Sequence, residues 1–335
     1  MRNRAARMMA IAALMLPLAA AAEPVEIRLA YYGSEDTNSF RYGVKPFVDG
    51  VNAEGSGLLR IRVLSNGVLG PSLAEQPRLA LGGTADIAWI APGQTPYRFP
   101  DSAVVELPGL FRDAREGTLA YSRLIAAKAL QGYEDYFVIG TFMSEPAIIH
   151  SRKPIGSLAA LNGQRIRANN QVIAEVLERM GALPTVLESS KIAVAITRGT
   201  IDGTAMNPNG IFDFHAAEAV RHHFFLRTGA TPLALVMNRK KYESLSDAAK
   251  ALIAKYSGER AAATWIRLFG AREREAFEMI KSQAGRTLVE PTQSDLETAQ
   301  RIYQTLIGAW AAKSPRNRQL LQTVRAELTA IRSGQ

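Results

Sequence analysis

The pattern of apolar and polar positions alternates between strand and helix periods along the first part of the chain. Residues 25–31 and 59–63 alternate apolar side chains with Glu or Arg, and residues 87–90 are a short apolar run, which predicts three strands. Apolar residues between 40 and 51 recur at helical spacing, and Ser72 with Glu75 is a capping pattern that predicts a second helix. Because parallel neighbours need crossover connections, this order predicts an α/β lobe with a mostly parallel sheet.

A second unit of the same kind follows. Residues 165–167 and 184–187 are predicted strands, with a helix between them over residues 172–180. Gly199-Thr200-Ile201-Asp202 echoes Gly83-Thr84-Ala85-Asp86 at the same place, between a helix and a strand. Such short echoes also arise by chance, but two lobes of like design explain them economically.

The C-terminal part has helical periodicity. Ser246 is a predicted N-cap, the apolar pattern continues past residue 265, and Ser294 with Glu297 is a second capping pattern. Ser314-Pro315 is typical of the start of a last helix. The aromatic residues of these helices are expected in the core.

The N-terminal segment changes the picture, because it indicates export. Arg2, Arg4 and Arg7 precede an apolar run over residues 8–18 that ends in alanines, the layout of a secretory signal peptide. The alternative, a membrane anchor, is opposed by the shortness of the run and by Pro17. We expect residues 1–22 to be a signal peptide and the rest to fold as one large or two medium domains.

Composition and charge exclude several classes of protein. The chain has no cysteine, so no disulfide, thiolate metal site or cysteine nucleophile is available. Its net charge of +9 raises nucleic-acid binding as an alternative, but Lys and Arg are scattered and aromatic residues make up only 7%. A diffuse positive field that attracts small anions is the better interpretation, and we expect no nucleic-acid partner.

No catalytic or metal-binding motif stands out in the sequence. The nucleophile elbow, zinc-protease, phosphate-loop and dinucleotide fingerprints are all missing. The four histidines, at positions 150, 215, 222 and 223, lack carboxylates at metal-ligand spacing. We therefore expect a binding protein with no cofactor and no metal, and not an enzyme, although a hydrolase with a triad assembled from distant positions stays open.

One charged residue has a position that suggests ligand binding. Arg167 ends a predicted strand just before a helix, and ligands of open α/β folds bind at the carboxyl ends of strands. Strand alternation places Arg165 and Arg167 on one face, where exposure to solvent is the alternative. An arginine that is partly buried without an acidic neighbour needs an anion from elsewhere, and its planar fork matches a carboxylate.

Several segments together resemble the DctP-type solute-binding proteins of TRAP (tripartite ATP-independent periplasmic) transporters. They are Leu69-Gly70, residues 81–87, Glu106-Leu107-Pro108-Gly109-Leu110-Phe111, residues 158–167, Met180-Gly181-Ala182-Leu183-Pro184 and residues 197–203. The resemblance runs from about residue 25 to 260. It implies an α/β, two-lobed clamshell like that of periplasmic binding proteins, with mostly parallel sheets flanked by helices, hinge strands and a long helix bracing both lobes.

The resemblance also implies a function and a location. Such a protein works in the periplasm as a monomer, captures a small organic anion, and delivers it to TRAP membrane subunits. We expect lobe 1 at residues 23–146 plus about 231–258, lobe 2 at 147–230 plus about 259–285, and C-terminal helices packing across the lobes at 286–335. An ATP-driven importer or a membrane sensor as the partner stays open.

The resemblance assigns Arg167 as the carboxylate anchor. Asn207 and Asn209 are candidate pocket residues, with turn formation around Pro208 as the alternative. Three aromatic residues at strand ends are candidate walls, with core packing as the alternative: Tyr31, Tyr32 and Trp89.

The sequence departs from one branch of this family. Sialic-acid-type members carry a second arginine near the segment Ser144-Glu145-Pro146-Ala147, which has none here. Glu145, placed beside the site, would repel an acid. We therefore expect a monocarboxylate, or an acid that bears hydroxyl or aromatic groups, over a dicarboxylate.

Overall fold

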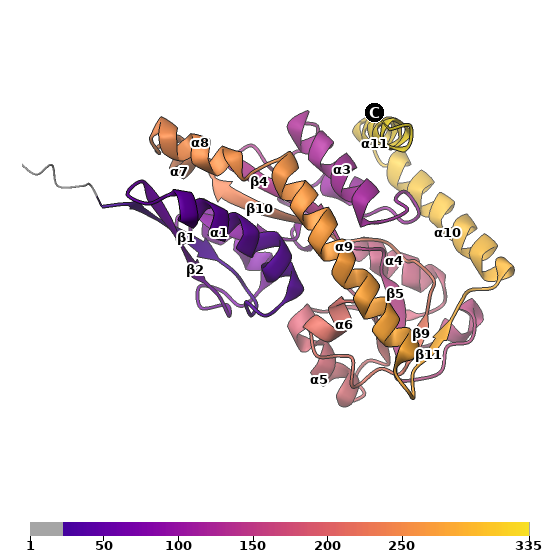
Figure 1. The fold of residues 1–335 in the computed structure, drawn as a ribbon. Helices are drawn as coiled ribbons and strands as arrows, with labels where there is room; N and C mark the ends of the chain where they lie inside the picture. The colour runs from indigo at the N-terminus through magenta and orange to yellow at the C-terminus, as the bar shows by residue number, and fades with distance from the viewer. Residues whose placement is uncertain (1–22, 335) are drawn as a thin grey trace, which may run out of the picture.

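The first lobe is built on a five-stranded sheet with the order β2-β1-β3-β10-β4 (Figure 1). The computed structural model describes residues 23–334, so the predicted signal peptide lies outside the described residues. The strands are β1 (Val25–Ala30), β2 (Leu59–Leu64), β3 (Ile87–Ile90), β4 (Tyr136–Met143) and β10 (Pro232–Asn238). The helices are α1 (Lys45–Glu54) after the π-helical turn η1 (Phe40–Val44), α2 (Gln76–Leu81), α3 (Ala114–Ala126), α7 (Arg239–Glu243) and α8 (Asp247–Lys255), with 3₁₀ turns η2 (Leu73–Glu75), η3 (Pro92–Gln94) and η4 (Ser102–Val105).

The second lobe is built on a six-stranded sheet with the order β11-β9-β5-β8-β6-β7. Its strands are β5 (Ile148–Ser151), β6 (Arg165–Ala168), β7 (Leu183–Val186), β8 (Gly203–Met206), β9 (His222–Phe224) and β11 (Thr287–Val289). Its helices are α4 (Gln171–Arg179), α5 (Ile192–Thr197) and α6 (Gly210–Asp213), with 3₁₀ turns η5 (Leu158–Leu161) and η6 (Ser189–Lys191).

Both sheets are mixed. Within residues 23–334, five of the nine strand pairings are parallel. The four antiparallel pairings all involve β5 or β10, the strands that follow the passages of the backbone between the lobes at residues 144–147 and 225–231. Four of the parallel pairings are connected by crossovers within a lobe, as expected for βαβ units, whereas β9 and β11 are connected through lobe 1, by β10 and residues 239–282.

Two hinge segments connect the lobes: 144–147 between β4 and β5, and 225–231 between β9 and β10. They lie side by side, because Ser144 N donates to Thr231 O at 3.0 Å and Thr228 N donates to Ala147 O at 2.8 Å. The hinge is therefore a pair of chain segments that are hydrogen-bonded to each other.

The long helix α9 (Glu259–Ser282) runs along both lobes, as Figure 1 shows. Trp265 and Phe269 are buried in the core of lobe 1, and Ile280 is buried in a core cluster of lobe 2. The expected two-lobed clamshell with a bracing helix is thus confirmed. Because α9 belongs to both cores, the boundary that gave residues 259–285 to lobe 2 alone does not describe it.

Aromatic packing holds α9 against the sheet of lobe 1. The ring of Trp89 lies 5.2 Å from Phe142 and 6.0 Å from Trp265, between centroids, and Trp265 Nε1 donates to Met143 O at 2.9 Å. Residue 43 is glycine because a Cβ there would lie 2.7 Å from the Trp89 ring. Burial of rings this large contributes strongly to the stability of the lobe.

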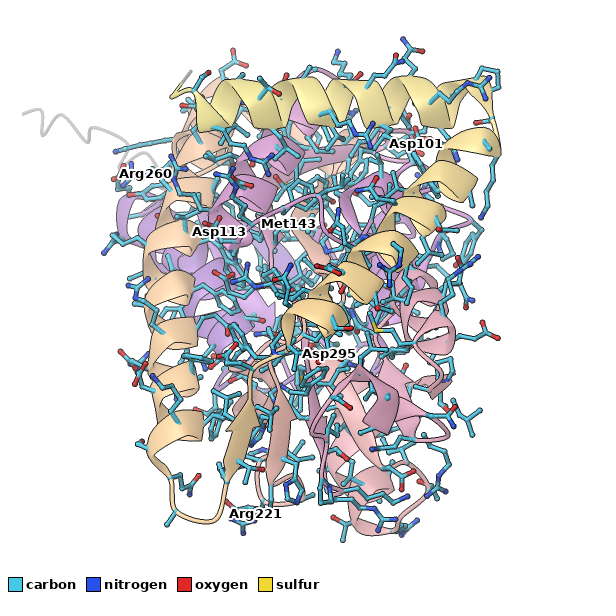
Figure 2. The ribbon with its side chains drawn as sticks, turned by 90° about the vertical axis from the view of Figure 1, so that its right-hand side faces the viewer. Asp101, Asp113, Met143, Arg221, Arg260 and Asp295 are labelled. Carbon is cyan, nitrogen blue, oxygen red and sulfur yellow. The ribbon has the colours of Figure 1, made fainter. Side chains whose placement is uncertain are left out.

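The C-terminal helices α10 (Gln293–Ala312) and α11 (Pro315–Arg332) cross one side of the molecule, and Figure 2 shows α11 along its end. α10 contacts α4 of lobe 2, and α11 contacts α3 of lobe 1. The sequence did not predict β11, which precedes them and extends the sheet of lobe 2. In residues 23–334, no helix combines the length and the hydrophobicity that a membrane span requires.

Two capping predictions had different outcomes. Ser72 caps as predicted, through Ala74 N at 3.2 Å, but it opens η2 before α2 begins. The capping pattern predicted at residues 294–297 is wrong, because the helix is capped two residues earlier by a reciprocal capping box of Thr292 and Asp295. Asp295 also accepts from Leu158 N at 2.9 Å, a tertiary contact that fixes this start.

Candidate functional site

A small cavity of about 60 Å³, here called the interlobe cavity, lies where the lobes meet beside the hinge. It is lined from lobe 1 by Tyr32, Ser39, Leu73, Trp89 and Leu233, from the hinge segments by Ser144, Ala147 and Thr231, from lobe 2 by Arg167, Asn169, Ile173, Ser189, Ala205, Met206, Asn207, Asn209, Gly210, Asp213 and Phe214, and from α9 by Phe269. β1, β6 and β8 end at the cavity, the place where open α/β sheets bind ligands.

Arg167 is fully buried in the wall of this cavity. Its Nε donates to Leu187 O at 2.7 Å, and its Nη2 donates to Asn169 Oδ1 at 2.8 Å and Ser189 Oγ at 3.0 Å. Among the described residues, Nη1 has no hydrogen-bond partner and no carboxylate pairs with this arginine. Burial lowers the pKa of Arg167 to about 9, so the group is still a cation at neutral pH.

The neighbouring Arg165 has a different environment, although it lies on the same face of β6. Its side chain is 41% exposed and pairs with Asp202 at 3.0 Å. Arg152 and Lys153 also pair with Asp202, and the hydrogen bonds from Arg165 hold the pKa of that carboxyl well below its usual range. Arg165 is therefore compensated, whereas Arg167 carries a buried charge that an anion from outside the chain would balance.

Asn207 and Asn209 both line the interlobe cavity after β8, and both contact Glu273 of α9. Asn207 Nδ2 donates to Glu273 Oε1 in a short contact, and Asn209 N donates to Glu273 Oε2 at 3.2 Å. The two asparagines therefore do more than form a local turn around Pro208. Their contacts with Glu273 also hold this turn against the bracing helix.

Hydrogen bonds join the lobes across the mouth of the cavity. Asn38 of lobe 1 donates from its backbone to Asp213 Oδ2 at 3.0 Å and from Nδ2 to Asp213 Oδ1 at 2.8 Å and Asn209 Oδ1 at 2.6 Å. Ser72 donates to Glu188 at 2.5 Å, also between lobes. Burial raises the pKa of Asp213 to about 7. The lobes are thus closed, and the contacts between Asn38, Asn209 and Asp213 form an interlobe latch.

The structure separates the other predicted site residues. Tyr32 and Trp89 line the interlobe cavity, although Trp89 also packs in the core of lobe 1. Tyr31 does not line it, because its ring is buried in that core with its hydroxyl 2.7 Å from Thr37 Oγ1. Glu145 lies on a different cavity of about 350 Å³, together with Glu273, and accepts from Ala114 N at 3.2 Å. Burial raises the pKa of Glu145.

Sequence reasoning missed several residues of the site: Asn38, Asn169, Ser189, Asp213, Phe214 and Phe269. Ser189 lies in a short 3₁₀ turn and has no local pattern that marks it as a site residue. Phe269 lies on α9, where a core role was expected for every aromatic residue. The Asp213–Asn38 contact joins residues 175 positions apart, so no local pattern could reveal it.

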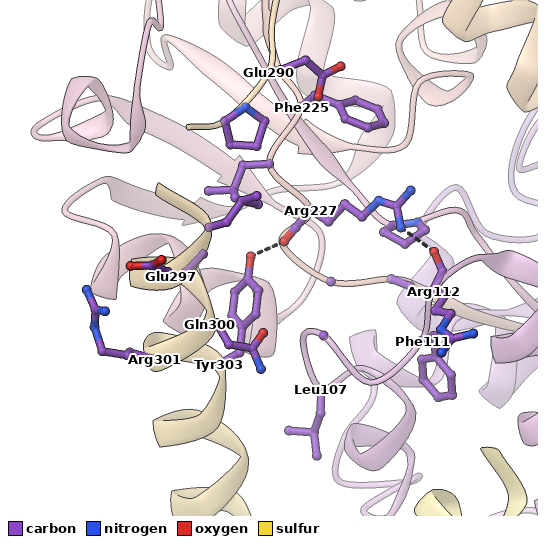
Figure 3. A pocket seen from close by; sticks show the side chains of 18 of the residues that line it. Leu107, Phe111, Arg112, Phe225, Arg227, Glu290, Glu297, Gln300, Arg301 and Tyr303 are labelled. Carbon is purple, nitrogen blue, oxygen red and sulfur yellow. Dashed lines mark hydrogen bonds between the residues drawn. The ribbon is translucent and has the colours of Figure 1, made fainter. Parts of the chain in front are cut away.

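A larger groove of about 950 Å³, here called the hinge groove, shares no lining residue with the interlobe cavity (Figure 3). The second hinge segment, the loop before α3 and α10 form its walls. Its arginines have partners: Arg227 Nη1 donates to Arg112 O at 2.6 Å, and Arg301 Nη2 donates to Thr298 Oγ1 at 2.8 Å. Tyr303 donates to the Arg227 carbonyl, which anchors α10 to the hinge.

Two of the histidines contact each other. His150 and His223 are buried in adjacent strands with their Nδ1 atoms 2.7 Å apart, and His150 Nε2 lies 3.1 Å from Met206 O. Burial lowers the pKa of both groups, so both are neutral near pH 7. A neutral pair is satisfied if His150 Nε2 donates to Met206 and His223 Nδ1 donates to His150. Across residues 23–334, no three His, Asp or Glu side chains are grouped as metal ligands.

Two α/β lobes, a hydrogen-bonded hinge and a closed cavity with one unpaired buried cation define a clamshell solute-binding protein. The sequence agrees, because residues 29–314 match the family described as bacterial extracellular solute-binding protein, family 7, or DctP. The chain belongs to this family, which confirms the resemblance.

The proteins similar to this chain bind different organic acids. The C4-dicarboxylate-binding periplasmic protein DctP of Rhodobacter capsulatus is 23% identical over 242 residues, which are 69% of this chain and 70% of that protein. A marine-metagenome TRAP solute-binding protein specific for aromatic acids, solved with 3-hydroxybenzoate, is 26% identical with a TM-score of 0.82, covering 92% of this chain and 98% of that one.

A third similar protein supports the fold alone. The TRAP solute-binding protein of Rhodoferax ferrireducens, solved with copurified benzoate, is 24% identical with a TM-score of 0.83, and covers 91% of this chain and 98% of that one. The overall arrangement of lobes, hinge and helices is thus that of TRAP solute-binding proteins.

Proposed function

We propose that this protein captures a small organic monocarboxylate with an aromatic or hydroxylated body in the periplasm, and delivers it to the membrane subunits of a TRAP transporter. The observation that carries the proposal is the free Nη1 of the buried Arg167 in the interlobe cavity. A carboxylate that accepts from this atom would complete the guanidinium's hydrogen bonds and neutralise its charge.

The other walls of the cavity favour the rest of the ligand. Aromatic surface comes from Tyr32, Trp89, Phe214 and Phe269. Polar surface comes from the asparagines Asn169, Asn207 and Asn209. Arg167 is the only Lys or Arg among the described lining residues, so a second carboxylate would have no cation to pair with. The aromatic acids bound by the marine-metagenome relative fit this combination better than the C4-dicarboxylates of the Rhodobacter relative.

The periplasmic location rests on the sequence of residues 1–22, which has the layout of a signal peptide, and on membership of an extracellular solute-binding family. A solute binder for an ATP-driven importer would have the same fold. Neighbouring genes for a small and a large TRAP membrane subunit support the proposal, and an ATPase gene in their place contradicts it.

A thermal-shift screen tests the ligand class. The mature protein is unfolded and refolded to remove bound ligand and then mixed with benzoate, 3-hydroxybenzoate, mandelate, C4-dicarboxylates, neutral sugars and amino acids. A ligand that binds only the folded state raises the melting temperature by mass action. We expect the largest rise with the aromatic and hydroxylated monocarboxylates. A rise only with neutral sugars would contradict the proposal, and consumption of the ligand would indicate an enzyme instead of a receptor.

A further inference from the structure

Glu273 is a buried carboxyl on the bracing helix that reaches the wall of the interlobe cavity. Glu273 is only 4% exposed. Its two carboxyl oxygens accept hydrogen bonds from Asn207 Nδ2 and from Asn209 N. No Lys or Arg pairs with it among the described residues. A single side chain of α9 thus holds both asparagines of the turn that follows β8.

The same contacts continue to lobe 1. Asn209 Nδ2 donates to Asp213 Oδ2 at 3.2 Å, and Asn209 Oδ1 accepts from Asn38 Nδ2 at 2.6 Å. Asp213 accepts two further hydrogen bonds from Asn38. A continuous chain of hydrogen bonds therefore runs from α9 through the lobe-2 wall of the cavity to the rim of lobe 1.

We propose that Glu273 is a positioning residue for acid binding, which fixes Asn207 and Asn209 in the cavity wall and links the bracing helix to the interlobe latch. This inference rests on the proposed function. In the absence of Glu273, the buried Asn209 N–H would lack an acceptor, the partly buried Asn207 Nδ2 would lose its partner, and the turn would move to satisfy them. Displacement of either asparagine would disturb both the ligand's surroundings and the closed state.

The charge on Glu273 matters for an anionic ligand. Burial raises the pKa of Glu273 to about 8, and Glu145 and Asp213 act in the same direction. The charged groups around it are Asp213 on α6, Glu145 and Arg227 from the hinge region, and Arg274 and Glu278 on α9. Glu273 is therefore mostly neutral at pH 7, and ionises as the pH rises through 8. The charged form would repel a bound carboxylate, so acid affinity is expected to fall over that range.

Calorimetric titration of the refolded protein with 3-hydroxybenzoate at pH 6.5, 7.5 and 8.5 tests this role. The variants are E273L, which removes both acceptors, and E273Q, which keeps the shape and one acceptor but cannot ionise. E275L is the matched control, because Glu275 lies half exposed on the same helix and its carboxylate pairs with Arg272.

We expect E273L to weaken binding about tenfold at pH 6.5, because the buried Asn209 N–H and the partly buried Asn207 Nδ2 both lose their partner. E273Q should bind within about threefold of wild type at pH 6.5, because Asn207 can turn its amide to suit it. Its affinity should change less than that of wild type between pH 6.5 and 8.5, and E275L should follow wild type throughout.

Three results would decide against the inference. E273L could bind as tightly as wild type, or E273Q could follow the wild-type pH profile; either outcome overturns the positioning role while leaving the proposed function intact. If E273L does not fold, the pH profile of E273Q decides alone. Failure of wild type to bind any of the monocarboxylates contradicts the proposed function itself, and the inference with it.

Discussion

The interlobe cavity and the hinge groove differ in a way that identifies the ligand site. The groove is far larger, about 950 Å³ against about 60 Å³, and it carries more arginines. Yet Arg227 in the groove donates to a backbone carbonyl, whereas Arg167 in the small cavity keeps a buried N–H without a partner. An unbalanced buried charge, not the available volume, is what requires a ligand.

A second buried charged group shows why the sign of the charge matters. Glu106 directly precedes the groove residue Leu107, is 2% exposed, and has an Oε1 atom without a hydrogen-bond partner. Burial raises its pKa to about 8, so at neutral pH it holds a proton and loses its charge. A carboxyl group can relieve burial in this way, whereas a guanidinium stays charged and needs a counter-ion.

The largest effect is expected for R167A. Removal of one partner from a desolvated charge pair costs about 2 to 5 kcal/mol of binding free energy. Titration with the best monocarboxylate of the panel should therefore show a loss of affinity of at least about thirtyfold. An unchanged dissociation constant, with an unchanged melting temperature of the ligand-free protein, would refute the role of Arg167.

The next prediction concerns Glu106 and the pH dependence of the free energy of unfolding. Its folded pKa of about 8 lies above the ordinary value of 4.5, so the folded state binds the proton more tightly. This contribution is fully present below about pH 4.5 and is lost as the pH rises to about 8. In urea unfolding, E106Q should lack this part of the decline, which is at most about 5 kcal/mol. Parallel pH curves for both proteins would show that Glu106 ionises normally.

A smaller effect is expected at the latch. N38A removes the two side-chain hydrogen bonds that Asn38 Nδ2 donates to Asp213 and Asn209, which should weaken ligand binding by about 1 to 2 kcal/mol. The change should appear mainly as faster dissociation in stopped-flow measurements, because the latch acts after closure. S72A, which removes the contact to Glu188 together with the local cap on Ala74 N, is a second variant and should have a weaker effect, because only one hydrogen bond between the lobes is lost. Slower association with unchanged dissociation would contradict a latch.

The smallest effect is expected for R227A in the hinge groove. Its guanidinium hydrogen-bonds a backbone carbonyl and is not needed to balance a ligand, so acid affinity should stay within about twofold of wild type. If R227A lost as much affinity as R167A in the same titration, the hinge groove and not the interlobe cavity would be the ligand site.

The sequence predicts the lobes well because their strands and helices follow local periodicity. The strand that carries Arg167 and the helix after it agree with their predicted ranges to within one residue at each end, and the position of that arginine near a strand end is a local signal. The adjacent pair Tyr31 and Tyr32 shows the limit. Neighbouring strand residues point to opposite sides, and only the fold decides that Tyr31 enters the core while Tyr32 faces the cavity.

The rest of the site depends on tertiary contacts. Asn38, Asp213 and Glu273 come from three distant segments. The sequence around each of them indicates only an ordinary turn or helix residue. Glu145 illustrates the converse, since this residue of the first hinge segment lines a different cavity from the one that contains Arg167. Long-range pairing of this kind leaves no periodic trace in one sequence.

The most direct test of the central claim is a crystal structure of the protein with a bound aromatic monocarboxylate such as 3-hydroxybenzoate. We predict that the ligand lies in the interlobe cavity with a carboxylate oxygen within hydrogen-bond distance of Arg167 Nη1. A ligand bound in the hinge groove, or one whose carboxylate leaves Nη1 without a partner, would contradict it.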